Sequence, residues 1–157
     1  MRSTRGLLIA VVLLCAFGLV SGAQTEHGTA AAQAGKSIHI TRVFTGPDGL
    51  THSEEIEAKP DPSGTGNVVK LMPVSGAEIH RLTPGTTLNW HPGPRYQYVI
   101  TISGHGELEI ADGKKIAEDP GHITLIEDTT GKGHITRPFG TEDRVALWLP
   151  LAEQPGH

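Results

Sequence analysis

Cysteine, aromatic residues and long helical patterns are all scarce in this chain of 157 residues. The single cysteine, Cys15, lies in an apolar N-terminal run, so the remainder can form neither a disulfide nor a thiolate metal site. Aromatic residues make up only 4% of the sequence, and the core must therefore be mainly aliphatic. The formal charge of −4 gives no reason to expect nucleic-acid binding. The length is that of one domain with one core.

The N-terminal 23 residues have the organisation of a secretory signal peptide. Arg2 and Arg5 precede an apolar run over residues 6–20, and residues 21–23 (SGA) form a small-x-small cleavage site. The run is shorter than the roughly 20 residues that a membrane-spanning helix needs. We expect cleavage after Ala23, secretion, and no membrane attachment afterwards. Residues 24–36 have no hydrophobic period, which predicts a flexible leader.

Glycine and proline are abundant, with 20 and 11 residues respectively. Together with short alternating segments, they predict many short strands joined by tight turns. About ten strands are expected, over residues 37–44, 53–58, 67–73, 77–82, 96–103, 107–111, 115–116, 123–126, 135–137 and 144–151. This pattern favours an all-β fold, an antiparallel jelly roll of two sheets, over residues 37–157.

Residues 84–104 (PGTTLNWHPGPRYQYVITISG) form the stretch around which the other strands are arranged. The alternation over residues 96–103 puts Gln97 and Val99 on one face of a strand. Ile100 and Ile102 lie on the opposite face, which is apolar enough to pack against another sheet or subunit. The strand therefore has one face suited to a barrel interior and one suited to a partner.

The spacing of this stretch resembles the first motif of the cupin superfamily, which reads Gly, five residues, His-x-His, three or four residues, Glu, six residues, Gly. The corresponding residues here are Gly85, His91, Gly93, Gln97 and Gly104. Residues 121–134 (GHITLIEDTTGKGH) resemble the second motif, so the match covers roughly residues 76–150. The resemblance implies a single cupin barrel, a double-stranded β-helix, with a metal at its mouth. Two ligands depart from the motif, because glycine replaces the second histidine and glutamine replaces glutamate.

By this resemblance, the metal ligands are His91, Gln97 and His134. Two imidazoles and a neutral amide leave the charge of a divalent ion uncompensated, and the carboxylate of the two-histidine, one-carboxylate iron oxygenases is missing. Neutral, nitrogen-rich sites suit copper, which also stands at the top of the divalent affinity order. Copper is therefore the favoured cofactor, followed by zinc, nickel or iron. In the alternative interpretation, the three side chains form a hydrogen-bonded core or a small-molecule pocket without metal.

His52, in the extended segment before residues 53–58, is a further candidate for the metal site. Cupins often lay an N-terminal segment across the barrel, which would bring this histidine near the mouth. His80 and His122 are alternatives for the same role. With nine histidines in the chain, each of the three can equally be an ordinary surface or strand histidine.

Three further residues are candidates for substrate binding. Trp90 and Tyr96 flank the first motif histidine, and they predict either a stacking platform for sugar rings or part of the core. Arg95, like Arg137, is either a substrate contact or one half of a salt bridge at the rim.

The chain is most similar to small secreted bacterial monocupins with the pattern Trp-His-x-x-Pro-Arg-x-Gln, of which one branch is a copper-dependent cupin that cleaves cellulose oxidatively. This resemblance implies a secreted copper-dependent oxidoreductase acting on a polysaccharide, with His91 and His134 as the catalytic residues. One alternative is a non-redox isomerase or epimerase in which either histidine is a general base. Another is a non-catalytic module that binds a metal or a sugar. The apolar outer face and the extended segment over residues 37–58 predict a homodimer.

Overall fold

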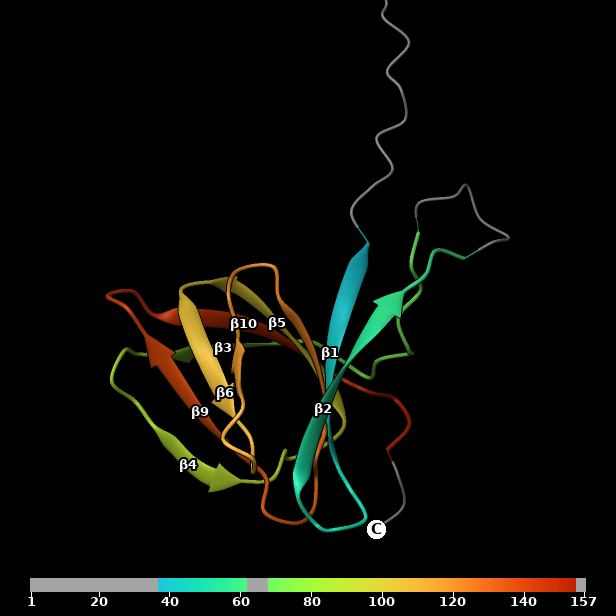
Figure 1. Ribbon diagram of the computed structural model, residues 1–157. Coiled ribbons are helices and arrows are strands. Elements are labelled where there is room, and N and C mark those ends of the chain that lie inside the picture. Colours follow the sequence, from blue (N-terminus) through green and yellow to red (C-terminus); the bar gives the residue numbers. More distant parts are fainter. Residues whose placement is uncertain (1–36, 62–67, 155–157) are drawn as a thin grey trace, which may run out of the picture. The chain divides into compact units, whose positions relative to one another are not determined.

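The computed structural model describes residues 37–61 and 68–154, and both the predicted signal peptide and the predicted leader lie outside this part of the chain. No helix in the described residues is long and apolar enough to cross a membrane. The described residues form ten strands (Figure 1): β1 (Ile38–Thr45), β2 (Thr51–Ala58), β3 (Glu78–Leu82), β4 (Leu88–His91), β5 (Gln97–Ser103), β6 (His105–Glu109), β7 (Lys115–Ala117), β8 (Ile123–Glu127), β9 (His134–Phe139) and β10 (Arg144–Pro150).

The strands form two sheets that face each other (Figure 1). One sheet has six strands in the order β2-β1-β8-β5-β10-β3, and the other has four in the order β4-β9-β6-β7. All the pairings are antiparallel except that of β1 with β8. The chain crosses repeatedly between the sheets, which is the arrangement of a jelly roll. The prediction of an all-β jelly roll of two sheets is confirmed.

The core is aliphatic and lies in two layers on the two faces of the six-stranded sheet. Between the sheets, one cluster consists of Val43, Val99, Leu108, Ile110, Ile116, Ile126 and Ala146. On the opposite face, a second cluster consists of Ile40, Tyr98, Leu125 and Leu151. Strand alternation explains the division, because consecutive side chains of one strand point to opposite faces.

The prediction of a strand over residues 67–73 is wrong for the described part, residues 68–73. This segment passes over the second cluster, where Leu71 packs and the backbone N–H of Met72 donates to Tyr98 Oη at 3.4 Å. Its only described bridge follows it, between Val74 and Leu151. Pro73 has no N–H to give to a strand ladder, and Val68 remains 52% exposed. The apolar residues of this segment thus cover a sheet instead of joining it.

The short strand β4 was not predicted, because four residues are too few for a clear alternation. It pairs with β9, and the register places His91 directly opposite His134. Strand β4 is therefore the element that brings the two motif histidines together.

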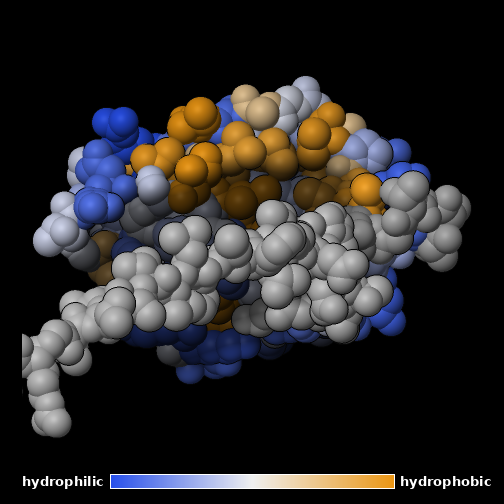
Figure 2. Space-filling model, turned by 90° about the horizontal axis from the view of Figure 1, so that it is seen from above, coloured by the Kyte–Doolittle hydropathy of each residue, from blue (hydrophilic) through white to orange (hydrophobic). Residues whose placement is uncertain are grey.

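The outer face of the six-stranded sheet is apolar across several strands. Ile79, Leu147, Ile100 and Ile123 are successive cross-strand neighbours from β3 to β8. Ile79 is 73% exposed, and Ile102 is 52% exposed. Figure 2 shows hydrophobic side chains gathered in a band along one side of the molecule. In the described residues, this part of the face has no covering segment comparable to residues 68–74.

Candidate functional site

A cavity lies between the two sheets and collects the motif residues from distant parts of the chain. The space open to the centre of a water molecule is about 40 Å³, which is room for a few waters or a small ligand group. Its lining is mostly apolar with a few polar side chains, and comprises Leu82, Leu88, His91, Gly93, Pro94, Gln97, Val99, Leu108, Glu118, Ile126, His134, Thr136, Arg144 and Trp148. The three side chains predicted from the motifs therefore share one cavity.

The rings of His91 and His134 lie next to each other. Their centroids are 4.6 Å apart, and the ring planes are inclined at 59°. The antiparallel pairing of β4 with β9 creates this proximity, because directly opposed residues of two paired strands carry neighbouring side chains. Two imidazoles at this distance can share one ligand or one metal ion.

His134 is buried and is held by a buried carboxylate. Its Nδ1 lies 2.6 Å from Oδ2 of Asp128, which is itself fully buried. The hydroxyl of Thr51, on β2, donates to the same oxygen at 3.2 Å. A carboxylate accepts, so Nδ1 of His134 carries the proton and Nε2 keeps its lone pair in the neutral ring.

His91 is held in the same tautomer by a different kind of partner. Its Nδ1 lies 2.7 Å from the backbone carbonyl oxygen of Asn89. A carbonyl oxygen can only accept, so Nδ1 is again the protonated nitrogen. Both histidines therefore have Nε2 as the nitrogen that is free to bind a metal or a proton at the cavity.

The amide of Gln97 lies at the start of β5 and is 1% exposed. Its Oε1 accepts a hydrogen bond of 3.1 Å from Nε of Arg95, which also donates through Nη2 to Glu78 at 2.6 Å. The oxygen of the amide keeps a second lone pair for another partner. Gln97 can thus supply either an oxygen ligand or a hydrogen-bond donor to the cavity.

The glycine at the second motif position is required by its surroundings. A Cβ at Gly93 would lie 2.5 Å from Cγ2 of Ile126 and 3.3 Å from Oδ1 of Asp128. The backbone N–H of Gly93 also donates to the carbonyl of Asp128 at 2.9 Å. Ile126 therefore occupies the space that a side chain at position 93 would need.

A buried ion pair forms another part of the cavity wall. Nη2 of Arg144 lies 3.1 Å from Oε2 of Glu118, and both side chains are 3% exposed. The guanidinium also donates to the hydroxyl of Thr101 at 3.0 and 3.3 Å. Gly106 leaves the necessary space, since a Cβ there would lie 2.6 Å from Cδ of Arg144. This pair gives the cavity a polar region without net charge.

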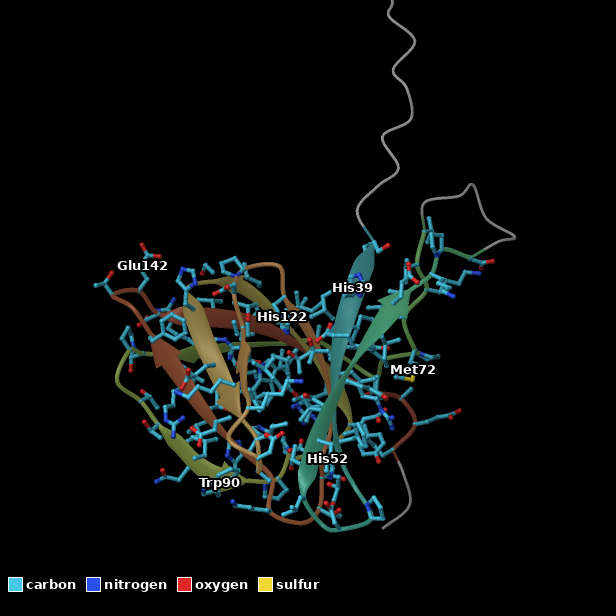
Figure 3. The ribbon with its side chains drawn as sticks, in the orientation of Figure 1. His39, His52, Met72, Trp90, His122 and Glu142 are labelled. Atoms are coloured by element: carbon cyan, nitrogen blue, oxygen red, sulfur yellow. The ribbon has the colours of Figure 1, made fainter. Side chains whose placement is uncertain are left out.

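The other candidate histidines do not join the motif residues. His52 lies on β2 (Figure 3), with its Nε2 3.0 Å from Asp48. Its side chain is 47% exposed. Its strand neighbour Thr51 points inward to Asp128, so alternation directs His52 outward. His122 precedes β8, at the other end of that strand from Asp128. His80 stacks on the indole of Trp148, with centroids 3.8 Å apart.

The candidate substrate-binding residues lie in different surroundings. Trp90 lies on β4 (Figure 3) and is 38% exposed. One face of its ring is occupied by the ammonium of Lys132, 3.7 Å from the ring centroid. Tyr96 packs against the second core cluster and does not line the cavity. Arg95 reaches the cavity only through Gln97.

Arg137 forms salt bridges of 2.6 Å with Glu109 and 3.3 Å with Glu107. These hydrogen bonds, first of all the one to Glu109, raise the pKa of Arg137 above its usual value. The salt-bridge alternative for this arginine is therefore the one that the structure supports.

Sequence reasoning missed the partners that orient the site. Asp128 and Thr51 hold His134, while Glu118 and Arg144 line the cavity. Asp128 had a detectable signal, because an acidic residue six positions before a candidate ligand can orient that ligand. The other three had none, since their proximity depends on strand pairing.

The donor set is neutral and small. No group of three or more histidine, cysteine, aspartate or glutamate side chains in residues 37–61 and 68–154 is arranged to hold a metal ion. The carboxylate of Glu118 in the lining is paired with Arg144, which leaves His91 and His134, with Gln97, as the donors that the cavity offers to a cation. This set suits a metal that accepts few, neutral ligands better than one that needs several carboxylates.

Comparison with known proteins gives weak similarities. No protein family model and no curated protein matches the chain. Similar solved structures include a cupin protein from Bacteroides fragilis, at 17% identity over 52% of this chain and 70% of the other, with a TM-score of 0.35. They also include ectoine synthase from P. lautus, at 24% identity over 49% of this chain and 56% of the other, with a TM-score of 0.36.

The capsular polysaccharide assembling protein CapF from Staphylococcus aureus is similar over 55% of this chain and 27% of its own length, at 18% identity and a TM-score of 0.39. All of these scores are below 0.5, so the jelly-roll assignment rests on the strand order of the two sheets. That order and the two motif segments agree with a cupin-type barrel.

Proposed function

We propose that this protein is a secreted, copper-dependent oxidoreductase in which His91 and His134 hold the metal and Gln97 adjoins it. The observation that supports it most directly is the anchoring of both rings. Each Nδ1 is bound by an acceptor, Asn89 O at 2.7 Å and Asp128 Oδ2 at 2.6 Å. Metal-binding histidines generally donate their other ring N–H to a carbonyl or a carboxylate in this way.

The donor chemistry also suits copper. Two imidazole nitrogens and one amide oxygen carry no charge, which fits a nitrogen-rich copper site and does not fit a calcium or magnesium site. Bound copper would supply one-electron redox chemistry at a position left open to the substrate. Zinc, nickel and iron remain the alternatives for the same ligands.

The residues around the metal position have separate roles in this proposal. Asp128 orients the ring of His134 and fixes its tautomer. Val99, Leu108 and Ile126 make the surrounding wall apolar and limit the number of waters that can enter. A cavity of this size cannot hold a sugar chain, so a polysaccharide such as cellulose would lie across its mouth. Trp90, through the part of its ring that remains exposed, and Arg95 are the proposed contacts.

The test is to load the mature chain with copper, add ascorbate and cellulose, and analyse soluble products by mass spectrometry. Oxidised oligosaccharides are expected from the native chain, and none from His91→Ala or His134→Ala. His105→Ala is a matched control, because His105 forms an exposed pair with Asp119 at 2.8 Å. If the native chain yields no oxidised product, or if His91→Ala yields as much as His105→Ala, the proposal is wrong.

A second candidate function is supported by the buried pair of Asp128 and His134. A carboxylate that orients an imidazole makes Nε2 of that ring a competent general base, which suits an isomerase or epimerase acting on a small substrate in the cavity. This function predicts activity that survives removal of all metal by a chelator. Ligand-dependent stabilisation without turnover would instead identify a binding module.

We also propose a homodimer formed through the outer face of the six-stranded sheet. The row of Ile79, Leu147, Ile100 and Ile123 is apolar, and exposed apolar sheet faces of this kind can associate with a second copy. Light scattering should give twice the monomer mass, and Ile79→Lys or Ile102→Lys should give the monomer. Phe139→Lys, on the other sheet, is the control. A native monomer at micromolar concentration would contradict this proposal.

A further inference from the structure

Glu78 connects two walls of the cavity although it does not line the cavity itself. It lies at the start of the edge strand β3, and its side chain is 43% exposed. One carboxylate oxygen, Oε2, accepts from Nη2 of Arg95 at 2.6 Å and from Nε2 of His80 at 2.9 Å. These two hydrogen bonds hold the pKa of Glu78 below its usual value, with the bond from His80 as the larger cause.

The first connection fixes the orientation of the Gln97 amide. Nε of Arg95 donates to Oε1 of Gln97 at 3.1 Å. Because a guanidinium has only donors, the atom of the amide that Arg95 contacts must be the oxygen, which keeps its second lone pair for a partner in the cavity. Without Glu78, the Nη2 atom of Arg95 loses its acceptor and the guanidinium is no longer held in place. Either orientation of the amide then becomes available to Gln97.

The second connection holds the indole of Trp148. The imidazole of His80 stacks on this indole with centroids 3.8 Å apart and planes inclined at 10°. The pairing of β3 with β10 places Glu78 opposite Trp148 and His80 opposite Ala146. Trp148 lines the cavity and packs against the core cluster between the sheets. The hydrogen bond from His80 to Glu78 keeps the stacked imidazole in place.

We propose that Glu78 is a positioning residue that sets the Gln97 amide through Arg95 and the Trp148 indole through His80. The part that concerns Gln97 rests on the proposed function, whereas the part that concerns Trp148 does not. Half-exposed ion pairs contribute little to folding stability. The loss of Glu78 should therefore change the site much more than it changes the stability of the protein.

The first experiment uses the metal-free protein. The sequence contains two tryptophans, so Trp90→Phe leaves Trp148 as the only indole emitter. In this background, Glu78→Ala should shift the emission of Trp148 toward that of His80→Ala, and Glu78→Gln, which keeps one acceptor oxygen, should restore part of the native signal. Glu54→Ala is the matched control, because Glu54 pairs with Arg42 at 2.8 Å and is 51% exposed. Its emission should equal that of the parent.

The second experiment measures copper affinity by competition with a chelator. Glu78→Ala and Arg95→Ala should each weaken binding about 10–100-fold, the range for residues that orient metal ligands. The double variant should be no weaker than Arg95→Ala, because both changes break one chain of contacts. Glu54→Ala should bind as tightly as the native chain.

The outcomes separate this inference from the proposed function. If Glu78→Ala leaves both the emission and the copper affinity at the values of Glu54→Ala, the positioning role of Glu78 is overturned. If the native chain binds no copper, the proposed function fails, and the emission experiment still decides the role of Glu78. If Glu78→Ala unfolds the protein, Glu78→Gln gives the same comparison with the side-chain shape preserved.

Discussion

The two histidines of the site are fixed in the same tautomer by different means. His134 is buried and depends on the carboxylate of Asp128, which Thr51 also contacts. His91 is half-buried and depends on a backbone carbonyl two residues earlier in the chain. Local backbone thus orients one ligand, whereas the other needs a side chain and a hydroxyl from distant strands. The orientation of His134 can therefore be changed by mutating Asp128 or Thr51, without any change to the imidazole itself.

Among the variants that test this difference between the two histidines, Asp128→Ala should have the largest effect on stability and on copper affinity. Asp128→Ala leaves buried donors on His134 and Thr51 without an acceptor, so the free energy of unfolding should fall by at least about 2 kcal/mol. Copper affinity should fall about 10–100-fold as the ring loses its orientation. Urea denaturation and chelator competition measure the two effects.

The exposed pair of His105 and Asp119 supplies the control for that experiment. Asp119→Ala should change the free energy of unfolding by no more than about 0.5 kcal/mol and should leave copper affinity unchanged. Equal effects of the two aspartate variants would mean that the buried carboxylate does not orient His134.

A histidine at position 93 tests why the site has two imidazoles. Gly93→His should cost about 1–3 kcal/mol, because its Cβ would lie 2.5 Å from Cγ2 of Ile126. Gly93→His combined with Ile126→Ala makes space and should give nitrogen hyperfine splitting from three imidazoles in the EPR spectrum of the copper-loaded protein. Ile126→Ala alone is the reference and should show two.

Gly76→His is the control for the added side chain, because nothing lies within 4 Å of a Cβ at that position. Its effect on unfolding should stay within about 0.5 kcal/mol. If Gly93→His is as well tolerated as Gly76→His, then Ile126 does not explain the missing ligand.

A smaller effect is expected from Thr51→Val, which removes one of the two described hydrogen bonds to the carboxylate of Asp128 and keeps the shape of the side chain. The free energy of unfolding should fall by about 1 kcal/mol, and copper affinity should fall less than in Asp128→Ala. Thr45→Val is a comparison, because its hydroxyl donates to a carbonyl in an exposed position. Affinity loss as large as that of Asp128→Ala would show that Thr51, and not Asp128, controls the ring.

Surface carboxylates should make the smallest contribution to folding stability, and this contribution depends on pH. The pKa of Glu107 is lowered, mainly by its hydrogen bond from Lys115, and that of Asp48 is lowered, mainly by His52. Because these folded-state values lie below the usual ones, their stabilisation is complete above the usual carboxyl pKa and is lost as the pH falls through the folded values.

Denaturation at low salt should therefore show stability falling below about pH 4, with the fall reduced in 1 M NaCl. The substitution Glu107→Gln should make this loss of stability at low pH smaller still. A constant free energy of unfolding from pH 5 to pH 3 would contradict this prediction.

The segment 68–74 shows where local sequence misleads. Its apolar residues predicted a strand, yet they cover Tyr98 on the outer face of the sheet. Apolar side chains can be buried when their segment packs over a sheet as well as when it pairs within one. The composition of the segment does not distinguish these two arrangements. The same limit applies to β4, whose existence follows from its pairing with β9.

Local sequence patterns are enough to predict the turn-rich, all-β character of this protein and the two faces of β5, because alternation and turn residues act over a few positions. The sequence also identified His91, Gln97 and His134 as a set, since each lies at a fixed position in a motif. Three features become visible only in the folded chain: Asp128 holds His134, Ile126 excludes a side chain at Gly93, and His52 points away from the site. Those outcomes depend on the register between strands far apart in the chain, which no local pattern encodes.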